Sequence, residues 1–264
     1  MTPLASRIAV AIVGLPAVLA LVWAGGWWLF VLAAIAAILA LHEYALMTRS
    51  LRPVTLAAYA GALLSLVGAE LGGLDWTVAA FLTTLPLAFI LHWVGQTRQS
   101  ATVAIASTVL GAAWIGLCLA HLLLLRDIPK DGRLATFTVL LAVWAGDIGA
   151  FFAGRLIGRH KLAPALSPGK TWEGFVFGTI CTVFVAFVAL YKSDFLSIPQ
   201  SIVLGVVLAV SAPLGDLFES LLKRDMDVKD TGTLLGGHGG MLDRIDALLF
   251  AAPAAYFTIL AFTT

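Results

Sequence analysis

Long runs of apolar residues, separated by short polar breaks, fill the chain from one end to the other. An α-helix needs about 20 apolar residues to cross the hydrocarbon core of a bilayer. The pattern therefore predicts an all-α, polytopic integral membrane protein with about nine transmembrane helices. The predicted crossings are residues 8–24, 27–47, 55–73, 76–94, 101–125, 134–153, 174–192, 201–222 and 245–262.

The first two runs are separated only by Gly25 and Gly26. A hairpin that does not fully cross the membrane is therefore the alternative for this pair. The first run follows a lone Arg7, is long for a signal-peptide core, and precedes no small-x-small cleavage site. We expect it to be a retained anchor.

The composition excludes a water-soluble globular protein. Hydrophobic residues make up 61% of the 264 residues and charged residues only 12%, and the mean hydropathy is +0.99. Soluble domains have about 45–50% apolar and about 25% charged residues. The two cysteines, Cys118 and Cys181, lie in apolar stretches and are predicted to be core thiols rather than disulfide or zinc ligands.

The basic residues predict the orientation, because Lys and Arg beside membrane helices are retained on the cytoplasmic side. With a cytoplasmic N-terminus, twelve of the 16 fall inside and four outside. The net charge of +1 gives no reason to expect a nucleic-acid partner. The inside set is Arg7, Arg49, Arg52, Arg98, Arg155, Arg159, Lys161, Lys170, Lys223, Arg224, Lys229 and Arg244; the outside set is Arg126, Lys130, Arg133 and Lys192.

The acidic residues gather in the second half of the chain, where ten of the 15 lie between Asp147 and Asp246. The first half is predicted to be mostly scaffold. Asp147 and Asp216 fall inside predicted crossings, where an ionisable side chain is costly and is by default a candidate for function. The alternative is that each one merely ends its helix at the membrane interface.

One end of the eighth predicted helix has a polar stripe. Its members follow the spacing i, i+3, i+4, i+7, i+8, which places them on one helical face. Pro213, one turn earlier, cannot donate a backbone hydrogen bond, so a kink is predicted where the stripe begins. The stripe consists of Asp216, Glu219, Ser220, Lys223 and Arg224.

A glycine-rich segment follows the stripe and leads into the ninth helix. Glycines surround His238, and their N–H groups could approach an anion closely. Asp243 and Asp246 are three residues apart and share one face of the first helical turn. With Asp216 they would make a hard-oxygen site of the kind that binds Mg²⁺. The alternative is a capping and salt-bridge role with Arg244.

A second polar loop covers residues 154–174. Gly169-Lys170-Thr171 suggests a P-loop, but the Walker pattern requires glycine where this chain has Pro164, and a preceding strand is not expected. What remains is a basic, hydroxyl-bearing segment ahead of the seventh helix. Ser167 and Thr171 could donate to phosphate, Lys170 supplies a charge, and Glu173 could order a metal or the lysine. Arg155, Arg159 and Lys161 could equally hold anionic lipid head groups.

Both polar loops fall on the cytoplasmic side in the charge tally, so one site can include both. Carboxylates gathered with Lys, Arg and hydroxyl groups are suited to transfer of a nucleotide phosphoryl group, with a metal to neutralise phosphate charge. The sequence therefore favours a membrane-embedded enzyme that joins a soluble nucleotide to a lipid.

The last 120 or so residues resemble the phosphatidate cytidylyltransferase (CDP-diacylglycerol synthase) family. Its signature is S-x-hydrophobic-K-R-x4-K-D followed by H-G-G-x-x-D-R-x-D, and every fixed position is met between Ser220 and Asp246. Residues 147–151 and 167–174 resemble two further characteristic stretches. One departure is Gly236, where family members commonly have proline.

The resemblance implies that CTP and phosphatidic acid react to give CDP-diacylglycerol and pyrophosphate in phospholipid biosynthesis. It implies an integral-membrane homodimer that needs Mg²⁺, and it leaves a second cation such as K⁺ open. The location would be the cell inner (plasma) membrane, with the active site facing the cytoplasm. Residues 1–133 would form scaffold helices, and residues 134–264 a catalytic region with cytoplasmic loops 154–173 and 223–243.

The resemblance also implies roles for individual residues. Asp216, Asp243 and Asp246 would hold the metal, with Asp246 the most sensitive position. Lys223 and Arg224 would bind the triphosphate of CTP, and the phosphatidate oxygen would attack the α-phosphorus without a strong general base. The remaining substrate-binding candidates are Ser167, Lys170, Thr171, Glu173, Asp147, Ser220, Lys229, Asp230, His238, Gly239, Gly240 and Arg244.

Two other functions are weighed against this one. A cation- or proton-coupled transporter could use Asp147 and Asp216 as intramembrane relays, but it predicts internal repeats, and the sequence has no evident repeat. A CDP-alcohol phosphotransferase would need a longer acidic motif than the one that begins at Asp131-Gly132-Arg133.

Overall fold

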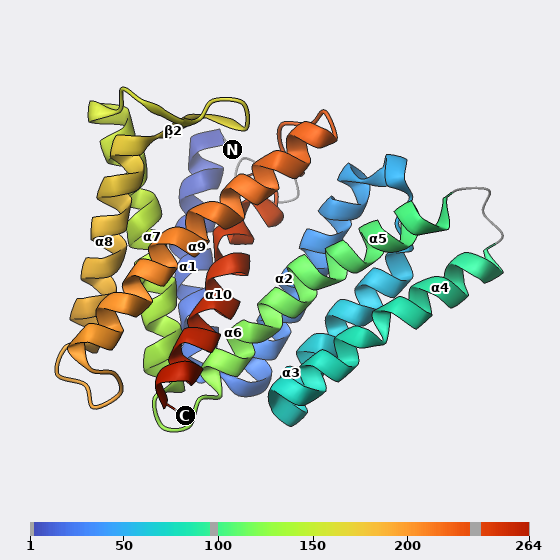
Figure 1. Ribbon diagram of the computed structural model, residues 1–264, viewed down its shortest axis with the longest axis horizontal. Helices are drawn as coiled ribbons and strands as arrows, with labels where there is room; N and C mark the ends of the chain where they lie inside the picture. Colours follow the sequence, from blue (N-terminus) through green and yellow to red (C-terminus); the bar gives the residue numbers. More distant parts are fainter. Residues whose placement is uncertain (1–2, 96–99, 233–238, 264) are drawn as a thin grey trace. The chain divides into compact units, whose positions relative to one another are not determined.

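The computed structural model describes residues 3–95, 100–232 and 239–263, with side chains described from residue 14 onward. Figure 1 shows a chain made almost entirely of helices. The helices are α1 (Pro3–Ala24), α2 (Gly26–Met47), α3 (Thr55–Leu82), α4 (Thr84–Val94), α5 (Ala101–Gly111), α6 (Cys118–Arg126), α7 (Gly132–Ile157), α8 (Trp172–Leu190), α9 (Ile198–Asp225) and α10 (Leu242–Thr263), with a 3₁₀ turn η1 (Arg49–Leu51) and a π-helical turn η2 (Ala112–Leu117).

The helical membrane class is confirmed. Each of the nine predicted runs lies in helical structure. Among the described residues, seven helical segments are long and apolar enough to cross a membrane, with Thr55–Val94 counted as one. Gly14–Ala24 of α1 is apolar but shorter. The count of nine crossings and the cytoplasmic N-terminus stay predictions.

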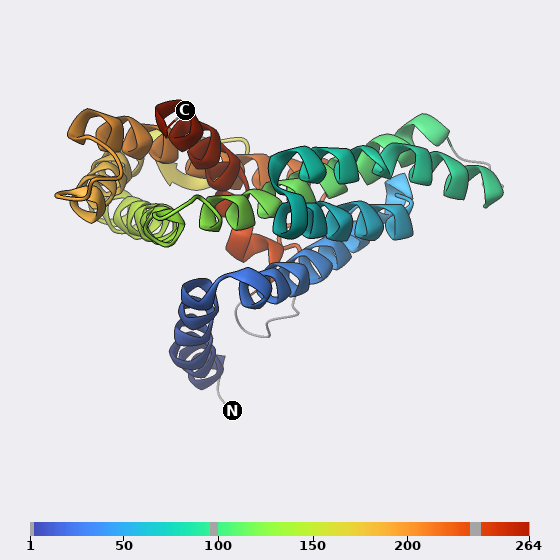
Figure 2. The ribbon, with the colours of Figure 1, turned by 90° about the horizontal axis from the view of Figure 1, so that it is seen from below.

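The segment Thr55–Val94 doubles back on itself at Gly73. This glycine has φ +71°, a left-handed conformation that residues with a Cβ rarely adopt. A Cβ on Gly68 would come within 2.6 Å of the Trp76 carbonyl oxygen, and the Thr84 side chain lies against Gly61. The chain therefore forms two arms with the reversal near residues 73–76, where the apolar pattern predicted a break. Figures 1 and 2 both show α4 beside α3.

Large apolar side chains remain exposed along most of the helices. Examples are Trp28, Trp76, Trp93, Leu156 and Phe184, each more than half exposed. Most buried side chains are Ala, Leu and Thr. Apolar residues on the outside and small residues at helix contacts are what a bilayer requires, because lipid is as apolar as the protein core.

The chain forms two compact units. The first unit contains Met1–Leu124 and Met226–Ile245; the second contains Leu125–Asp225 and Asp246–Thr264. In the first unit, the buried Tyr44 hydroxyl of α2 donates to the Ser107 carbonyl of α5 at 2.8 Å. The proposed functional division at residue 133 differs from these units and stays a prediction.

In the second unit, α7 and α8 pack closely through small residues. A Cβ on Gly178 of α8 would lie 2.8 Å from the Gly146 carbonyl oxygen and 2.9 Å from the Ala150 side chain of α7. Such contact is possible only because glycine lacks a side chain. It fixes α7 against α8 at the level of Asp147, the residue after Gly146.

The loop between α7 and α8 corrects the purely helical expectation. It contains two short antiparallel strands, β1 (Lys161–Ala163) and β2 (Ser167–Thr171), in which Lys161 pairs with Thr171. A strand therefore does precede Gly169-Lys170-Thr171, contrary to one ground on which the P-loop was rejected. The other ground, Pro164 in place of glycine, still stands.

Candidate functional site

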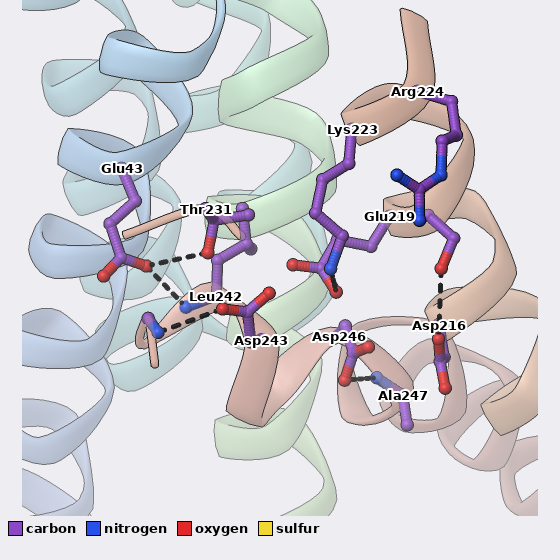
Figure 3. A network of polar contacts seen from close by, with 12 residues as sticks. Glu43, Asp216, Glu219, Lys223, Arg224, Thr231, Leu242, Asp243, Asp246 and Ala247 are labelled. Carbon is purple, nitrogen blue, oxygen red and sulfur yellow. Dashed lines mark hydrogen bonds and ion pairs between the residues drawn. The ribbon is translucent and has the colours of Figure 1, made fainter. Parts of the chain in front are cut away.

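The polar stripe on α9 is confirmed as a set of side chains on one face. The Ser220 hydroxyl donates to Asp216 Oδ1 at 3.4 Å, and Lys223 Nζ lies 3.3 Å from Glu219 Oε2 (Figure 3). Glu219 is only 1% exposed, although it is an acid. α9 is helical through Pro213, from Ile198 to Asp225, and the kink expected there stays a prediction.

Arg224, the last basic residue of the stripe, contacts the hairpin. Its Nε donates to the Leu166 carbonyl oxygen at 3.3 Å, in the turn between β1 and β2. Arg224 therefore has a positioning contact besides its predicted contact with phosphate. It holds the hairpin turn against the end of α9, within the second unit.

The hairpin brings Lys170 to the stripe. Lys170 Nζ of β2 forms an ion pair with Asp216 Oδ2 at 2.5 Å, and both side chains are partly buried. Asp147 of α7 interacts electrostatically with both partners of this pair. Asp246 of α10 interacts electrostatically with Asp216 and Asp147. We call Asp147, Lys170, Asp216 and Asp246 the carboxylate–lysine cluster; all four belong to the second unit.

Four separate elements build this cluster, namely α7, β2, α9 and α10. Asp246 also accepts a hydrogen bond from the Ala247 N–H at 2.7 Å. The α9–α10 contact is tight at this level, because a Cβ on Gly215 would meet the Asp246 carbonyl oxygen. Acidic side chains that are costly in an apolar bundle are thus held together, as expected of a functional site.

Glu173 occupies a different place from the one expected. It accepts hydrogen bonds from the Arg159 and His160 backbone N–H groups at 3.1 and 3.3 Å, and its Oε1 lies 2.6 Å from His160 Nδ1. Glu173 therefore closes the base of the hairpin. Its side-chain partner is His160, whereas Lys170 forms an ion pair with Asp216.

Thr171 is buried and caps a helix. Its hydroxyl oxygen accepts a hydrogen bond from the Gly174 N–H at 3.1 Å, at the start of α8. The predicted contact with phosphate would have to use the hydroxyl hydrogen, because the oxygen already serves the cap. Ser167 begins the same strand and is less buried.

Replacing Thr171 with valine is expected to destabilise the protein by about 1 kcal/mol, since valine keeps the shape but cannot accept the cap hydrogen bond. Thr171→Ser keeps the oxygen and is the matched control. Thermal unfolding in detergent, followed by circular dichroism, measures the difference. Equal melting temperatures for the two variants would contradict the capping role.

The three predicted metal ligands are divided between the units. Asp216 and Asp246 lie in the second unit and Asp243 in the first, so the structure does not place Asp243 relative to the other two. Among the described residues, no group of three or more His, Cys, Asp and Glu side chains is arranged to hold a metal ion. Asp243 Oδ2 accepts a hydrogen bond from the Gly240 N–H at 3.0 Å, so the capping alternative holds for this oxygen.

The other predicted residues lie around the glycine-rich segment. Gly239 has φ +79°, and a Cβ there would lie 3.3 Å from Asp243 Oδ2. Lys229, Asp230 and Arg244 are exposed. His238 lies outside the described residues.

Sequence reasoning missed Glu43 of α2. Its side chain is 0% exposed and its carboxylate accepts a hydrogen bond from the Leu242 N–H at 2.8 Å (Figure 3). It also accepts one from the Met241 N–H at 2.9 Å. The signal was present, because Glu43 is an acid inside a predicted crossing. The expectation that the first half is mostly scaffold overlooked it.

Fold and site together define a polytopic membrane protein with carboxylates, lysines and hydroxyls gathered at helix ends. The chain belongs to the cytidylyltransferase family, whose sequence model matches residues 5–262. This confirms the resemblance seen in the sequence and favours the enzyme over the transporter.

Several relatives are named phosphatidate cytidylyltransferase. The protein from Bacillus subtilis is 40% identical over 156 residues, which are 58% of this chain and 58% of the relative. The protein from Staphylococcus haemolyticus is 38% identical over 183 residues, which are 68% of this chain and 69% of the relative. The protein from Haemophilus influenzae is 44% identical over 130 residues, which are 47% of this chain and 45% of the relative. The matched stretches thus span about half to two thirds of these relatives.

Proposed function

We propose that the protein transfers a cytidylyl group from CTP to phosphatidic acid, giving CDP-diacylglycerol and pyrophosphate. The carboxylate–lysine cluster, built by four elements of a membrane protein of this family, is the observation that carries the proposal. The activity named for the relatives supports the choice of substrates.

In the proposed reaction, an oxygen of the phosphatidate phosphate bonds to the α-phosphorus of CTP. The bond between the α-phosphorus and the bridging oxygen to the β-phosphate breaks, and pyrophosphate leaves with its electrons. The attacking phosphate is already ionised at neutral pH, so the protein need not supply a strong base. Its contribution is to position two anions and to stabilise charge as it moves toward pyrophosphate.

The basic residues of the second unit suit the triphosphate. Lys223 and Arg224 lie in the last turn of α9. Lys170 of the hairpin contacts the same helix through its ion pair with Asp216. A phosphate group would compete with Asp216 for Lys170, because both are anions within reach of one ammonium. Two hydroxyl groups lie on the same elements as these basic residues: Ser167 on β2 and Ser220 on α9.

The donor set fits Mg²⁺. Mg²⁺ is usually held by one or two carboxylates, with waters and substrate phosphate completing six ligands. Asp216 and Asp246 would be those carboxylates, with Asp243 a further candidate, and a second cation such as K⁺ remains part of the proposal. When bound, Mg²⁺ would neutralise charge on the triphosphate.

We further propose that the enzyme is a homodimer in the cell inner (plasma) membrane, with its N-terminus and active site facing the cytoplasm. The distribution of Lys and Arg supports the orientation, because twelve of the 16 fall on one side of the predicted crossings. CTP is a soluble nucleotide of the cytoplasm, so a site on that side can reach it.

The proposal is tested with the purified chain in detergent micelles that contain phosphatidic acid. CTP and Mg²⁺ are expected to yield a CDP-lipid, seen by mass spectrometry, and one pyrophosphate per lipid formed. ATP in place of CTP serves as the matched nucleotide control. A folded preparation that forms no CDP-lipid would contradict the proposal.

Removal of divalent cations is expected to abolish product formation, because the triphosphate charge would then face the carboxylates without neutralisation. The measurement is the same assay after treatment with EDTA, followed by addition of excess Mg²⁺. Activity should return with Mg²⁺. Undiminished activity in EDTA would show that the carboxylates do not serve a divalent cation.

A further inference from the structure

Glu43 lies at the centre of a buried hydrogen-bond arrangement in the first unit. Its Oε1 accepts from the Met241 N–H at 2.9 Å, and its Oε2 accepts from the Leu242 N–H at 2.8 Å. The Thr231 hydroxyl donates to Oε2 at 3.4 Å. These partners are about 190–200 residues away along the chain. One acid of α2 therefore contacts both Thr231 and the backbone at the start of α10.

The arrangement requires a carboxylate. Each oxygen of Glu43 accepts from a different backbone N–H, so both must be acceptors. A glutamine of the same size would place its NH₂ group against one of these donors. The two N–H groups belong to the start of α10, which has no earlier helical carbonyl to accept them and favours a negative charge.

The surrounding chain leaves room for this carboxylate. A Cβ on Gly240 would lie 2.6 Å from Glu43 Oε2, and a Cβ on Gly232 would lie 2.7 Å from Oε1. Both distances are shorter than real Cβ contacts. A side chain at residue 232 would crowd Glu43, and one at residue 240 would crowd both the Thr231 hydroxyl and Glu43.

The backbone that Glu43 contacts leads into a residue of the proposed site. Asp243 is the residue after Leu242, and its Oδ2 accepts a hydrogen bond from the Gly240 N–H. A shift of the Met241–Leu242 backbone would move the Asp243 carboxylate, which lies in the same unit as Glu43. Misplacement by about 1 Å can cost about 100-fold in rate.

We propose that Glu43 is a positioning residue for cytidylyl transfer, which fixes the Met241–Leu242 backbone at the start of α10. This inference rests on the proposed function. Glu43 itself is buried and is not proposed to touch substrate.

The test compares Glu43→Gln with Tyr44→Phe in the full chain. Tyr44 is the next residue of α2, is equally buried, and also makes a hydrogen bond to a distant backbone group. Its partner, Ser107, lies away from the glycine-rich segment in the sequence. We expect Glu43→Gln to lower kcat/KM for CTP by about 100-fold per folded molecule. Tyr44→Phe should lower thermal stability but keep kcat and KM.

Hydrogen exchange gives a readout that does not depend on activity. In Glu43→Gln, either the Met241 or the Leu242 amide should exchange at least about tenfold faster, because the glutamine NH₂ group takes the place of its acceptor. Tyr44→Phe should leave these amides unchanged. If the wild-type protein were inactive but the exchange were still faster in Glu43→Gln, the proposed function would be contradicted. The hydrogen bonds of Glu43 to the start of α10 would still be supported. Unchanged exchange would overturn the inference.

Two further variants keep the inference testable if Glu43→Gln does not fold. Gly240→Ala crowds the Thr231 hydroxyl and the Glu43 carboxylate together, and should reproduce the loss in kcat/KM and the faster exchange. Thr231→Val removes the longest of the three hydrogen bonds and should have a smaller effect on both. An active wild type whose Glu43→Gln or Gly240→Ala variant has unchanged kcat and KM would overturn the positioning role.

Discussion

Replacement of Asp246 with asparagine is expected to lower the rate of CDP-lipid formation by about 1,000-fold, the scale of losing one preorganised charge contact. Asparagine has the same size as aspartate, and its oxygen can still accept from the Ala247 N–H. The substitution also relieves electrostatic repulsion with Asp216 and Asp147. The variant should therefore be folded and inserted in the membrane, with an unfolding temperature no lower than that of the wild type.

Asp225→Asn is the matched control for this substitution. Asp225 is the last residue of α9, is exposed, and belongs to the same unit as Asp246. It should keep full activity, since it lies outside the cluster. Initial rates at saturating CTP and Mg²⁺, normalised to folded protein, measure both variants. An Asp246→Asn protein that kept more than a tenth of the activity would remove Asp246 from the proposed metal site.

The second large effect is expected at Lys223. Its ammonium lies 3.3 Å from Glu219, and the two side chains are 14% and 1% exposed. Lys223→Met removes the cation that pairs with the buried Glu219 carboxylate. The loss should destabilise the protein by about 3 kcal/mol. The substitution also removes a proposed contact with the triphosphate. Both stability and activity should fall.

A double substitution separates these two roles. Adding Glu219→Gln to Lys223→Met removes the buried charge, so the unfolding temperature should recover much of its loss. Activity should not recover, because the proposed triphosphate cation is still missing. The measurements are thermal unfolding in detergent and KM for CTP, on both single variants and the double variant. Recovery of KM together with stability would mean that Lys223 only supports the fold.

The helices could be predicted from the sequence because bilayer thickness fixes the length of an apolar run. The stripe on α9 could also be predicted, since residues such as Asp216 and Ser220, four apart, necessarily share a helical face. Gly73 lies at the end of one predicted run, and the chain does reverse there. These features depend on contacts within a few residues.

The features that were missed depend on contacts far along the chain. Nothing near Lys170 in the sequence indicates that it pairs with Asp216 rather than with Glu173. Glu43 meets Leu242 across 199 positions, and an apolar run gives no information on such partners. The residue type of Thr171 allows both a phosphate contact and a helix cap, and the structure shows that its oxygen serves the cap.

The fate of the phosphates of CTP tests cytidylyl transfer most directly. The purified protein is given phosphatidic acid, Mg²⁺ and CTP radiolabelled either at the α- or at the γ-phosphorus. If the lipid phosphate attacks the α-phosphorus, the α-label appears in the lipid product and the γ-label in released pyrophosphate. Label from the γ-position in lipid, or no label in lipid from folded protein, would contradict cytidylyl transfer.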